Sequence, residues 1–374
     1  YCNNEYDKGE IIYHTQVPIV PGEGIEILMD TVIESQHIEL PNVLKMWANN
    51  NFNNINNINN INKQYFDYPK INFCNKDDIK QIQIELENIK KFNIYYTYEW
   101  LELCARKEKC EFKFIFIELI RGEKCIFPYL KCKINNYNED NIYDAQSPYG
   151  YSGPLFWGNW SIEKKREAIE MINHFMKKDN IIYNFIRLSP HNTDDLSLYK
   201  NYKLLNARIN FYVDCLNKNL NIELLDQGWS KKAKRCLKIA VKKGTNLYRE
   251  TNNLKDIIEF SKIYKDTFER NEMEEYYNYD YNYIKTVLEI KNTKLLLINN
   301  YKEIISGCTI ILNDDHAIYH LGASYSNKMS LGGSDFYFYS MVDFCKKNNI
   351  RWLQIGGGKQ DNDSLYNKKK IYAD

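Results

Sequence analysis

Apolar and polar positions alternate over several short stretches in the middle of the chain, and this alternation is typical of β-strands. The first such stretch, 112–120, turns at 121–123 and returns as a second strand. The elements expected after the turn are strands at 124–133 and 141–144, a glycine-rich turn at 149–154, an amphipathic helix at 162–178 and a closing strand at 181–188.

The same order of elements recurs in the last third of the chain. A strand at 294–299 turns at 300–303. The pattern then predicts strands at 304–312 and 317–321, a turn at 328–333, a helix at 334–347 and a closing strand at 350–355. Two copies of one order predict an α/β (α+β) fold that contains two similar mixed sheets with flanking helices.

A low-complexity tract, NFNNINNINNINK at 51–63, has no core-forming pattern and is expected to be a linker. It separates a segment at 1–50 from two expected domains, at 64–215 and 216–374. The chain begins at Tyr1 rather than at Met, so we expect a piece of a longer protein.

Composition narrows the class of protein. The 374 residues include 50 Lys and Arg and 49 Asp and Glu, so the net charge of +1 argues against a globally basic nucleic-acid binder. Hydrophobic residues make up 44% of the chain, which indicates a folded protein. No apolar run approaches the roughly 18 residues that span a bilayer. We expect a cytoplasmic protein whose contact with membranes, if any, is peripheral.

Ten cysteines are spread over the chain without a CxxC pair. The spacings Cys104/Cys110 and Cys125/Cys132 fit neither zinc nor redox motifs, so reduced and mostly buried thiols are expected. The six histidines do not cluster with the cysteines, and no metal site is expected.

Gly332, Gly333 and Ser334 lie between a predicted strand and a predicted helix. Ser334 suits the N-cap position, and the free backbone N–H groups of a helix start bind phosphate or pyrophosphate. The alternative interpretation is an ordinary capped turn.

A predicted helix carries basic residues at helical spacing on one face, namely Lys231, Lys234, Arg235, Lys238 and Lys242. Apolar residues occupy its opposite face, and Gly244 suits its C-terminal cap. The basic face is either a solvated surface or a steering patch for a polyanion, such as the phosphates of CoA, a nucleotide-linked or lipid-linked pyrophosphate, or tRNA.

Two further features allow a functional and a structural interpretation. The tyrosine-rich segment YYNYDYNY at 276–283 either stacks on a sugar or adenine ring or reflects the bias of the chain toward Asn and Tyr. His320 lies on a predicted strand close to the turn at 328–333. It is either a general base or a structural histidine.

Three stretches resemble the FemAB-like branch of the acyl-CoA N-acyltransferase (GNAT-like) superfamily. They are SPYGYSGPL at 147–155, KKAKRCLKIAVKKG at 231–244, and residues 319–370, which begin YHLGASYSNKMSLGGSD and end DNDSLYNKKK. The resemblance runs from near residue 65 to the end. It implies tandem GNAT-like sheets and the transfer of an acyl or aminoacyl group onto an amine, with acyl-CoA (acetyl-CoA) or aminoacyl-tRNA as the donor.

The resemblance also implies functional residues. It places a donor phosphate at Gly332, Gly333 and Ser334, although the Arg or Gln that usually begins this loop is absent. Its terminal motif, Asp-Ser-Leu-Phe-x-Phe-Lys, maps onto 363–369, where Lys368 replaces the second aromatic residue. Candidates for proton handling or charge stabilisation are His320, Asp363 and Lys369. Substrate contacts are expected from Tyr149, Tyr151, Lys231, Arg235, Lys238 and Tyr325.

Residues 1–48 resemble the C-terminal part of the glycinamide-ribonucleotide and sugar formyltransferases. The resemblance maps one member of that family's catalytic Asn-His-Asp set onto Asp7, whereas the other two members would precede Tyr1. We therefore expect this segment to be inactive in formyl transfer. The alternative is a generic hairpin followed by one helix.

These observations predict an N-acyltransferase that acts on an amine of a cell-wall or surface-polysaccharide precursor, either a nucleotide- or lipid-linked amino sugar or a muropeptide. Two alternatives stay open. One is an aminoacyl-tRNA-dependent peptidoglycan-bridge aminoacyltransferase. The other is a non-catalytic module that binds a glycan or a partner and has a degenerate donor site.

Overall fold

A computed structural model of the protein describes residues 70–374 apart from 120, 135–140, 191–195, 206–208, 222, 224, 226–227 and 315. The formyltransferase-like segment with Asp7 and the low-complexity tract at 51–63 lie outside the described residues. The described chain divides into two units. One contains 70–73, Ile115–Ile126 and Leu155–Ala168, and the other contains Cys74–Phe114, Phe127–Pro154 and Ile169–Asp374.

The first sheet has the strand order β1-β2-β3-β4-β6, and β5 also pairs with β3. Its strands are β1 (Lys70–Phe73), β2 (Glu111–Glu118), β3 (Lys124–Lys133), β4 (Tyr143–Gln146), β5 (Leu155–Trp157) and β6 (Ile181–Phe185). Strand β4 runs antiparallel to β3 and parallel to β6, so the sheet is mixed.

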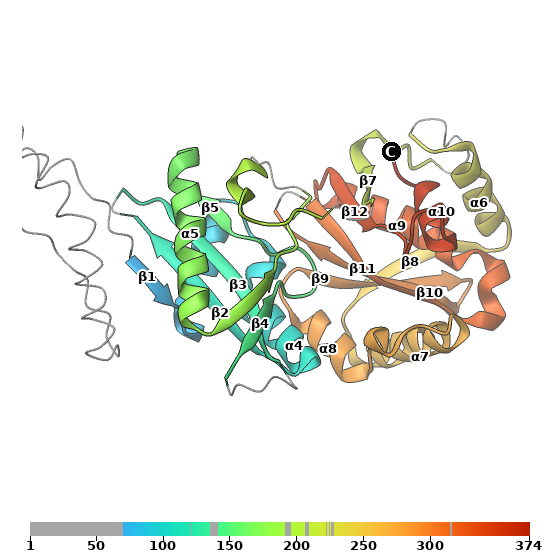
Figure 1. The fold of residues 1–374 in the computed structure, drawn as a ribbon. Helices are drawn as coiled ribbons and strands as arrows, with labels where there is room; N and C mark the ends of the chain where they lie inside the picture. The colour runs from blue at the N-terminus through green and yellow to red at the C-terminus, as the bar shows by residue number, and fades with distance from the viewer. Residues whose placement is uncertain are drawn as a thin grey trace, which may run out of the picture. The chain divides into compact units, whose positions relative to one another are not determined.

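The second sheet has the strand order β7-β12-β11-β10-β9-β8 (Figure 1). Its strands are β7 (Phe211–Asp214), β8 (Thr245–Thr251), β9 (Thr293–Asn300), β10 (Glu303–Leu312), β11 (His316–Ser324) and β12 (Trp352–Gly356). Strand β11 runs antiparallel to β10 and parallel to β12.

Several helices begin at a side chain that caps their first turn. The α-helices are α3 (Lys76–Asn88), α4 (Tyr98–Glu108), α5 (Ile162–Lys178), α6 (Lys231–Lys242), α7 (Leu254–Arg270), α8 (Tyr281–Glu289), α9 (Gly333–Lys347) and α10 (Ser364–Lys370). Asn75, Thr97 and Ser230 cap α3, α4 and α6, each accepting a backbone N–H in the first turn.

The two sheets share one order of elements, which confirms the predicted fold class. Each has a pair of neighbouring strands (β2 and β3, or β9 and β10), then an antiparallel strand (β4 or β11), a helix (α5 or α9) and a strand parallel to the preceding one (β6 or β12). The short strand β5 is an addition that the sequence pattern did not predict.

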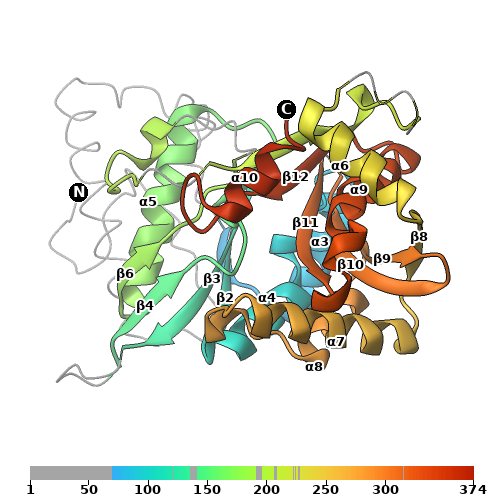
Figure 2. The same ribbon diagram turned by 90° about the vertical axis from the view of Figure 1, so that its right-hand side faces the viewer.

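Helices cover both faces of the second sheet. Successive side chains of a strand point to opposite faces, so they enter two different hydrophobic cores. Leu296 and Ile298 of β9 belong to the core under α6 and α9, whereas Leu295 and Leu297 belong to the core under α7 and α8. Figures 1 and 2 show α6 and α9 on one side of this sheet and α7 and α8 on the other. The strand is therefore apolar at every one of these positions.

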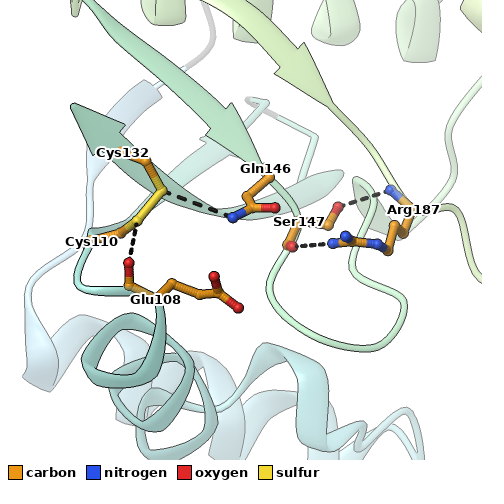
Figure 3. The surroundings of a disulfide bond; sticks show 6 residues. All are labelled: Glu108, Cys110, Cys132, Gln146, Ser147 and Arg187. Atoms are coloured by element: carbon orange, nitrogen blue, oxygen red, sulfur yellow. Dashed lines mark hydrogen bonds between the residues drawn. A yellow bond between two sulfur atoms is a disulfide. The ribbon is translucent and has the colours of Figure 1, made fainter. Parts of the chain in front are cut away.

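Two cysteines contradict the expectation of reduced thiols throughout. Cys110 and Cys132 form a disulfide, with Cα atoms 4.7 Å apart (Figure 3). The turn between β2 and β3 pairs Leu119 with Glu123, since the Leu119 N–H donates to the Glu123 carbonyl. Positions equidistant from Arg121 therefore face each other, and Cys110 and Cys132 are such a pair. The register of the hairpin therefore indicates this disulfide, whereas the spacing of cysteine motifs does not.

The predicted N-cap role of Ser334 is also wrong. Helix α9 begins at Gly333, and Gly332 occupies the N-cap position with a φ of +77° and no side-chain cap. A Cβ at Gly332 would lie 2.7 Å from the Cβ of Ala240 on α6. Close approach of α6 and α9 therefore requires glycine here.

In the part of the chain that the structure describes, no helix combines the length and apolar character needed to cross a bilayer. The same residues contain no group of three His, Cys, Asp or Glu side chains placed to hold a metal ion.

Candidate functional site

Strands β11 and β12 pair only along their first residues and then separate. Their parallel register joins His316 to Trp352 and Ile318 to Gln354, whereas β11 continues to Ser324. A cavity of about 580 Å³ lies where the two strands part, and it is lined by 318–322 of β11 and by 354–358 at the end of β12. All of its lining residues belong to one unit of the chain.

Tyrosine rings and basic side chains dominate this pocket. The tyrosines that line it are Tyr95, Tyr149, Tyr151, Tyr264, Tyr276, Tyr277, Tyr279 and Tyr319. Arg187, Lys359 and Lys369 also line it, and no Asp or Glu does so among the described residues. Such a lining suits a ligand that combines a ring with a negatively charged group.

A glycine-rich turn places Tyr149 and Tyr151 in the pocket wall. Gly150 between them has a φ of +107°, and a Cβ there would lie 2.0 Å from the Tyr95 ring. The indole N–H of Trp100 donates to the Tyr149 carbonyl over 2.9 Å. The turn predicted at 149–154 is therefore held against α4, and both tyrosines predicted to bind substrate reach the pocket.

Arg187 faces the pocket from the segment after β6. Its guanidinium donates to the Ser147 carbonyl over 2.8 Å, and its backbone N–H donates to Ser147 Oγ over 3.0 Å (Figure 3). In the described chain Arg187 has no carboxylate within ion-pair distance, so its charge is available to a ligand.

Gln354 presents an unused acceptor. Its side chain is 2% exposed and lines the pocket, and its Oε1 atom has no hydrogen-bond partner among the described residues. The same side chain hydrogen-bonds to the Tyr151 hydroxyl, which also accepts from Asn210 Nδ2. A ligand N–H is one group that would satisfy the Gln354 oxygen.

His320 lies on β11 among aromatic rings. The ring centroid of Trp100 is 5.4 Å away and that of Tyr149 is 5.9 Å away, and the Tyr283 hydroxyl is 3.5 Å from Nε2. Burial among these groups, with a smaller contribution from the charge of Lys107, lowers the pKa of His320 to about 3. The imidazole is therefore neutral at physiological pH.

Lys369 is the most deeply buried cation of the pocket, with 8% of its surface exposed. It lies in α10, and its ammonium donates to the Gly357 carbonyl over 2.9 Å. Burial lowers its pKa to about 8, an effect that the charge of Asp363 partly opposes. At neutral pH Lys369 is still mostly protonated, and it retains donors beyond the one used on Gly357.

Lys107 lies behind the tyrosine wall. Its ammonium is 3.7 Å from the ring centroid of Tyr279, 4.7 Å from that of Tyr276 and 5.4 Å from that of Tyr283. It also donates to the Tyr276 carbonyl. Helix α4 is thus connected to the tyrosine-rich segment, three of whose members line the pocket.

Other predicted site residues lie outside the pocket lining. Gly333 packs against Ser306, since a Cβ there would lie 2.5 Å from Ser306 Oγ. Asp363 caps α10 by accepting the Tyr366 N–H. The Tyr325 hydroxyl donates to Glu259 over 2.6 Å. Gly332 is the N-cap of α9, and Ser334 is the second residue of that helix. The functional roles of these residues stay predictions.

Four of the five basic residues of the α6 stripe are exposed, as their helical spacing predicts, and Lys234 is half-buried. Lys231, Arg235 and Lys238 face solvent, whereas Leu237 is fully buried beneath them. None of the three lines the pocket. Lys243 forms the C-cap of the helix, and Gly244 follows with a φ of +88°.

Sequence reasoning missed several residues of the pocket lining, and also Lys107 behind it. Arg187, Gln354 and Lys107 carry no local motif, because their positions depend on how distant elements pack. Gly356, Gly357 and Gly358 do carry a signal, since three glycines directly after a strand indicate a backbone that approaches something closely. The tyrosine-rich segment was hard to interpret, because the whole chain is rich in Tyr and Asn. Tyr276, Tyr277 and Tyr279 nevertheless line the pocket.

Comparison with solved structures identifies the fold. The crystal structure of FemX matches with a TM-score of 0.60 at 12% sequence identity, covering 81% of this chain and 94% of FemX. A conserved protein of unknown function from Bacteroides thetaiotaomicron VPI-5482 matches with a TM-score of 0.53 at 10% identity, covering 81% of this chain and 95% of that chain. The chain therefore shares the fold of FemX.

A third solved structure is the C-terminal domain of a putative lysylphosphatidylglycerol synthetase from Agrobacterium fabrum. It has a TM-score of 0.49 at 11% identity and covers 77% of this chain and 81% of that chain. No protein-family model matches the sequence, and no curated protein matches it significantly.

Proposed function

We propose that the protein is an N-acyltransferase that moves an acyl or aminoacyl group onto an amine of a cell-wall or surface-polysaccharide precursor, within the pocket between β11 and β12. The observation that carries the proposal is the lining of this pocket, where Lys369 and Arg187 face tyrosine rings in the absence of any described carboxylate. The sequence resemblance to FemAB-like transferases and the fold shared with FemX support this class of reaction.

In such a transfer the lone pair of the amine attacks the acyl carbonyl carbon. The C–N bond forms, the bond from that carbon to the sulfur or oxygen of the donor breaks, and a proton from nitrogen leaves to solvent or with the released carrier. Negative charge develops on the carbonyl oxygen, and a preorganised donor next to it lowers the barrier. In this proposal the Lys369 ammonium is that donor, because it is buried, positioned by Gly357 and still has free N–H groups.

Arg187 and the tyrosines would hold the precursor. An unpaired guanidinium binds phosphate or carboxylate, and the rings of Tyr149 and Tyr151 offer faces on which a sugar packs. A histidine with a pKa of about 3 is a weak acceptor for the proton of an ammonium group, so His320 is assigned a hydrogen-bonding role rather than that of general base.

The exposed basic stripe of α6 is compatible with two acyl donors. Its cationic residues would suit the phosphates of acyl-CoA or the backbone of aminoacyl-tRNA. Radiolabelled acetyl-CoA and radiolabelled aminoacyl-tRNA should each be incubated with the purified chain and a nucleotide-linked amino sugar, and the label on the amine should be counted. We expect transfer from one of the two donors.

A matched pair of variants tests the role of Arg187. Arg187→Gln should raise the KM for the acceptor about tenfold or more, because one charge-assisted contact contributes about 1.5–3 kcal/mol. Arg106→Gln, which changes an exposed arginine of α4, should leave the KM unchanged. If the chain binds the acceptor but transfers label from neither donor, the protein is the non-catalytic module instead.

A further inference from the structure

The pocket lining offers a ligand positive charge, and none of the described residues that line it is an Asp or a Glu. Lys359 at its edge lies 3.6 Å from Glu274, but Lys369 and Arg187 direct their N–H groups to backbone carbonyls. Within the described chain neither of these two cations has a carboxylate at ion-pair distance. An ammonium group that enters the pocket therefore meets like charges.

Lys107 adds a further positive charge behind the wall. Tyr279 lines the pocket, and the Lys107 ammonium lies 3.7 Å from the centroid of its ring. The acidic residues whose charges act on Lys107 are Glu108, Glu275 and Asp280, and none of them forms an ion pair with it in the described chain. This charge therefore lies against a ring that lines the pocket.

We propose that this lining binds the acceptor amine in its neutral, nucleophilic form, by repelling the ammonium form rather than by means of a general base. The inference rests on the proposed function and deepens it. A nearby like charge and the loss of solvation both disfavour a charged amine. The ammonium proton passes to bulk water when the amine enters, and the freed lone pair then attacks the acyl carbon. The second proton leaves the nitrogen as the donor's sulfur or oxygen departs.

Burial disfavours the charged form of the basic groups already present around the pocket, and the charge of Lys107 adds to this effect at His320 alone. Burial lowers the pKa of Lys369 to about 8 and that of His320 to about 3, and it also lowers the pKa of Lys107. Asp363 and the three acidic residues near Lys107 oppose these shifts without reversing them.

An amine built into the pocket tests the proposal without turnover. Met273 lines the pocket and is half-buried, so Met273→Lys introduces a primary amine there. Reductive methylation with ¹³C-formaldehyde and NMR titration would give the pKa of the added group. We expect a value at least about one unit below the ordinary lysine pKa of about 10.4. The exposed Lys370 serves as an internal reference in the same spectra.

Removing the surrounding charges distinguishes the effect of like-charge repulsion on the pKa of the added amine from the effect of burial. In the Met273→Lys background, Lys107→Met and Arg187→Gln should each raise the pKa of the added amine by about half a unit. If Met273→Lys does not fold, Leu365→Lys at the pocket rim takes its place in both measurements. An added amine that titrates at its ordinary value, or whose pKa neither charge removal changes, would overturn the inference.

These titrations are independent of catalysis. A lowered pKa together with no acyl transfer would reject the proposed function and leave the electrostatic property of the pocket established. Acyl transfer together with an ordinary pKa would reject the inference alone.

Discussion

At the scale of single residues, Gly150 is a position in the pocket wall that requires glycine. Gly150 combines a left-handed conformation with a ring at the place of its missing Cβ, whereas Gly122 has a φ of +87° and no heavy atom within 4 Å of that place. Both glycines therefore have a positive φ, but only Gly150 has a neighbouring group that would clash with a Cβ.

Gly150→Ala should destabilise the protein by about 3–5 kcal/mol, because a conformational cost of about 1–2 kcal/mol adds to overpacking against Tyr95. Gly122→Ala should lose only the conformational part. Urea unfolding of both variants measures the difference. Equal losses would show that the Tyr95 ring moves aside freely.

Lys369 should make stability depend on pH. Its pKa of about 8 lies below the ordinary value of 10.5, so between these values the native state binds fewer protons at this site than the unfolded chain does. The free energy of unfolding contributed by this site therefore rises with pH across that window. Relative to Lys369→Met, the native protein should gain on the order of 2–3 kcal/mol between pH 7.5 and 10. A constant difference in urea unfolding between the two proteins would contradict this.

Residues were predictable from sequence where a local pattern determines their role. Tyr149 and Tyr151 flank a glycine in a recognisable turn, and Lys369 ends a recognisable motif. Arg187 follows β6 and Gln354 lies within β12, and neither belongs to such a pattern. The separation of β11 from β12 opens the cavity that both of them line. At Ser334 a local pattern was misleading. Serine suits an N-cap, but Gly332 occupies that position, where close packing against Ala240 leaves no room for a side chain.

At the scale of elements, α6 separates a structural face from a charged one. Leu237 is fully buried in the core beneath the helix, whereas Ile239, two residues further on, is 41% exposed. The helical period alone predicted this division, because the core-facing positions repeat every three or four residues.

Leu237→Ala should cost about 2–5 kcal/mol of unfolding free energy, and Ile239→Ala should cost less than about 1 kcal/mol.

Replacing Lys231, Arg235 and Lys238 with Gln should change stability by only a few tenths of a kcal/mol, since exposed charges contribute little. If the stripe steers a polyanionic donor, the triple variant should bind acetyl-CoA or tRNA more weakly, most of all at low salt. Unchanged donor affinity at low salt would leave the stripe as a solvated surface.

At the scale of the whole molecule, the repeated order of elements was predictable and the cavity was not. Strand alternation and helix periodicity indicated both copies, because each is a local property of the chain. The cavity arises because the parallel register of β11 and β12 ends at Ile318 and Gln354, and register between distant strands leaves no mark in either strand alone. The disulfide between Cys110 and Cys132 escaped prediction for a related reason, since it follows from the register of β2 and β3.

The central claim is that acyl transfer takes place in the pocket between β11 and β12, with the Lys369 ammonium at the developing negative charge. The measurement that tests it most directly is the single-turnover rate of acyl transfer at pH 7.5 in Lys369→Met and in Lys370→Met, which changes the adjacent exposed lysine of α10. We predict a loss of about 10²–10³-fold for Lys369→Met, the range typical for removal of one oxyanion donor, and an unchanged rate for Lys370→Met. Equal transfer rates in the two folded variants would contradict the account.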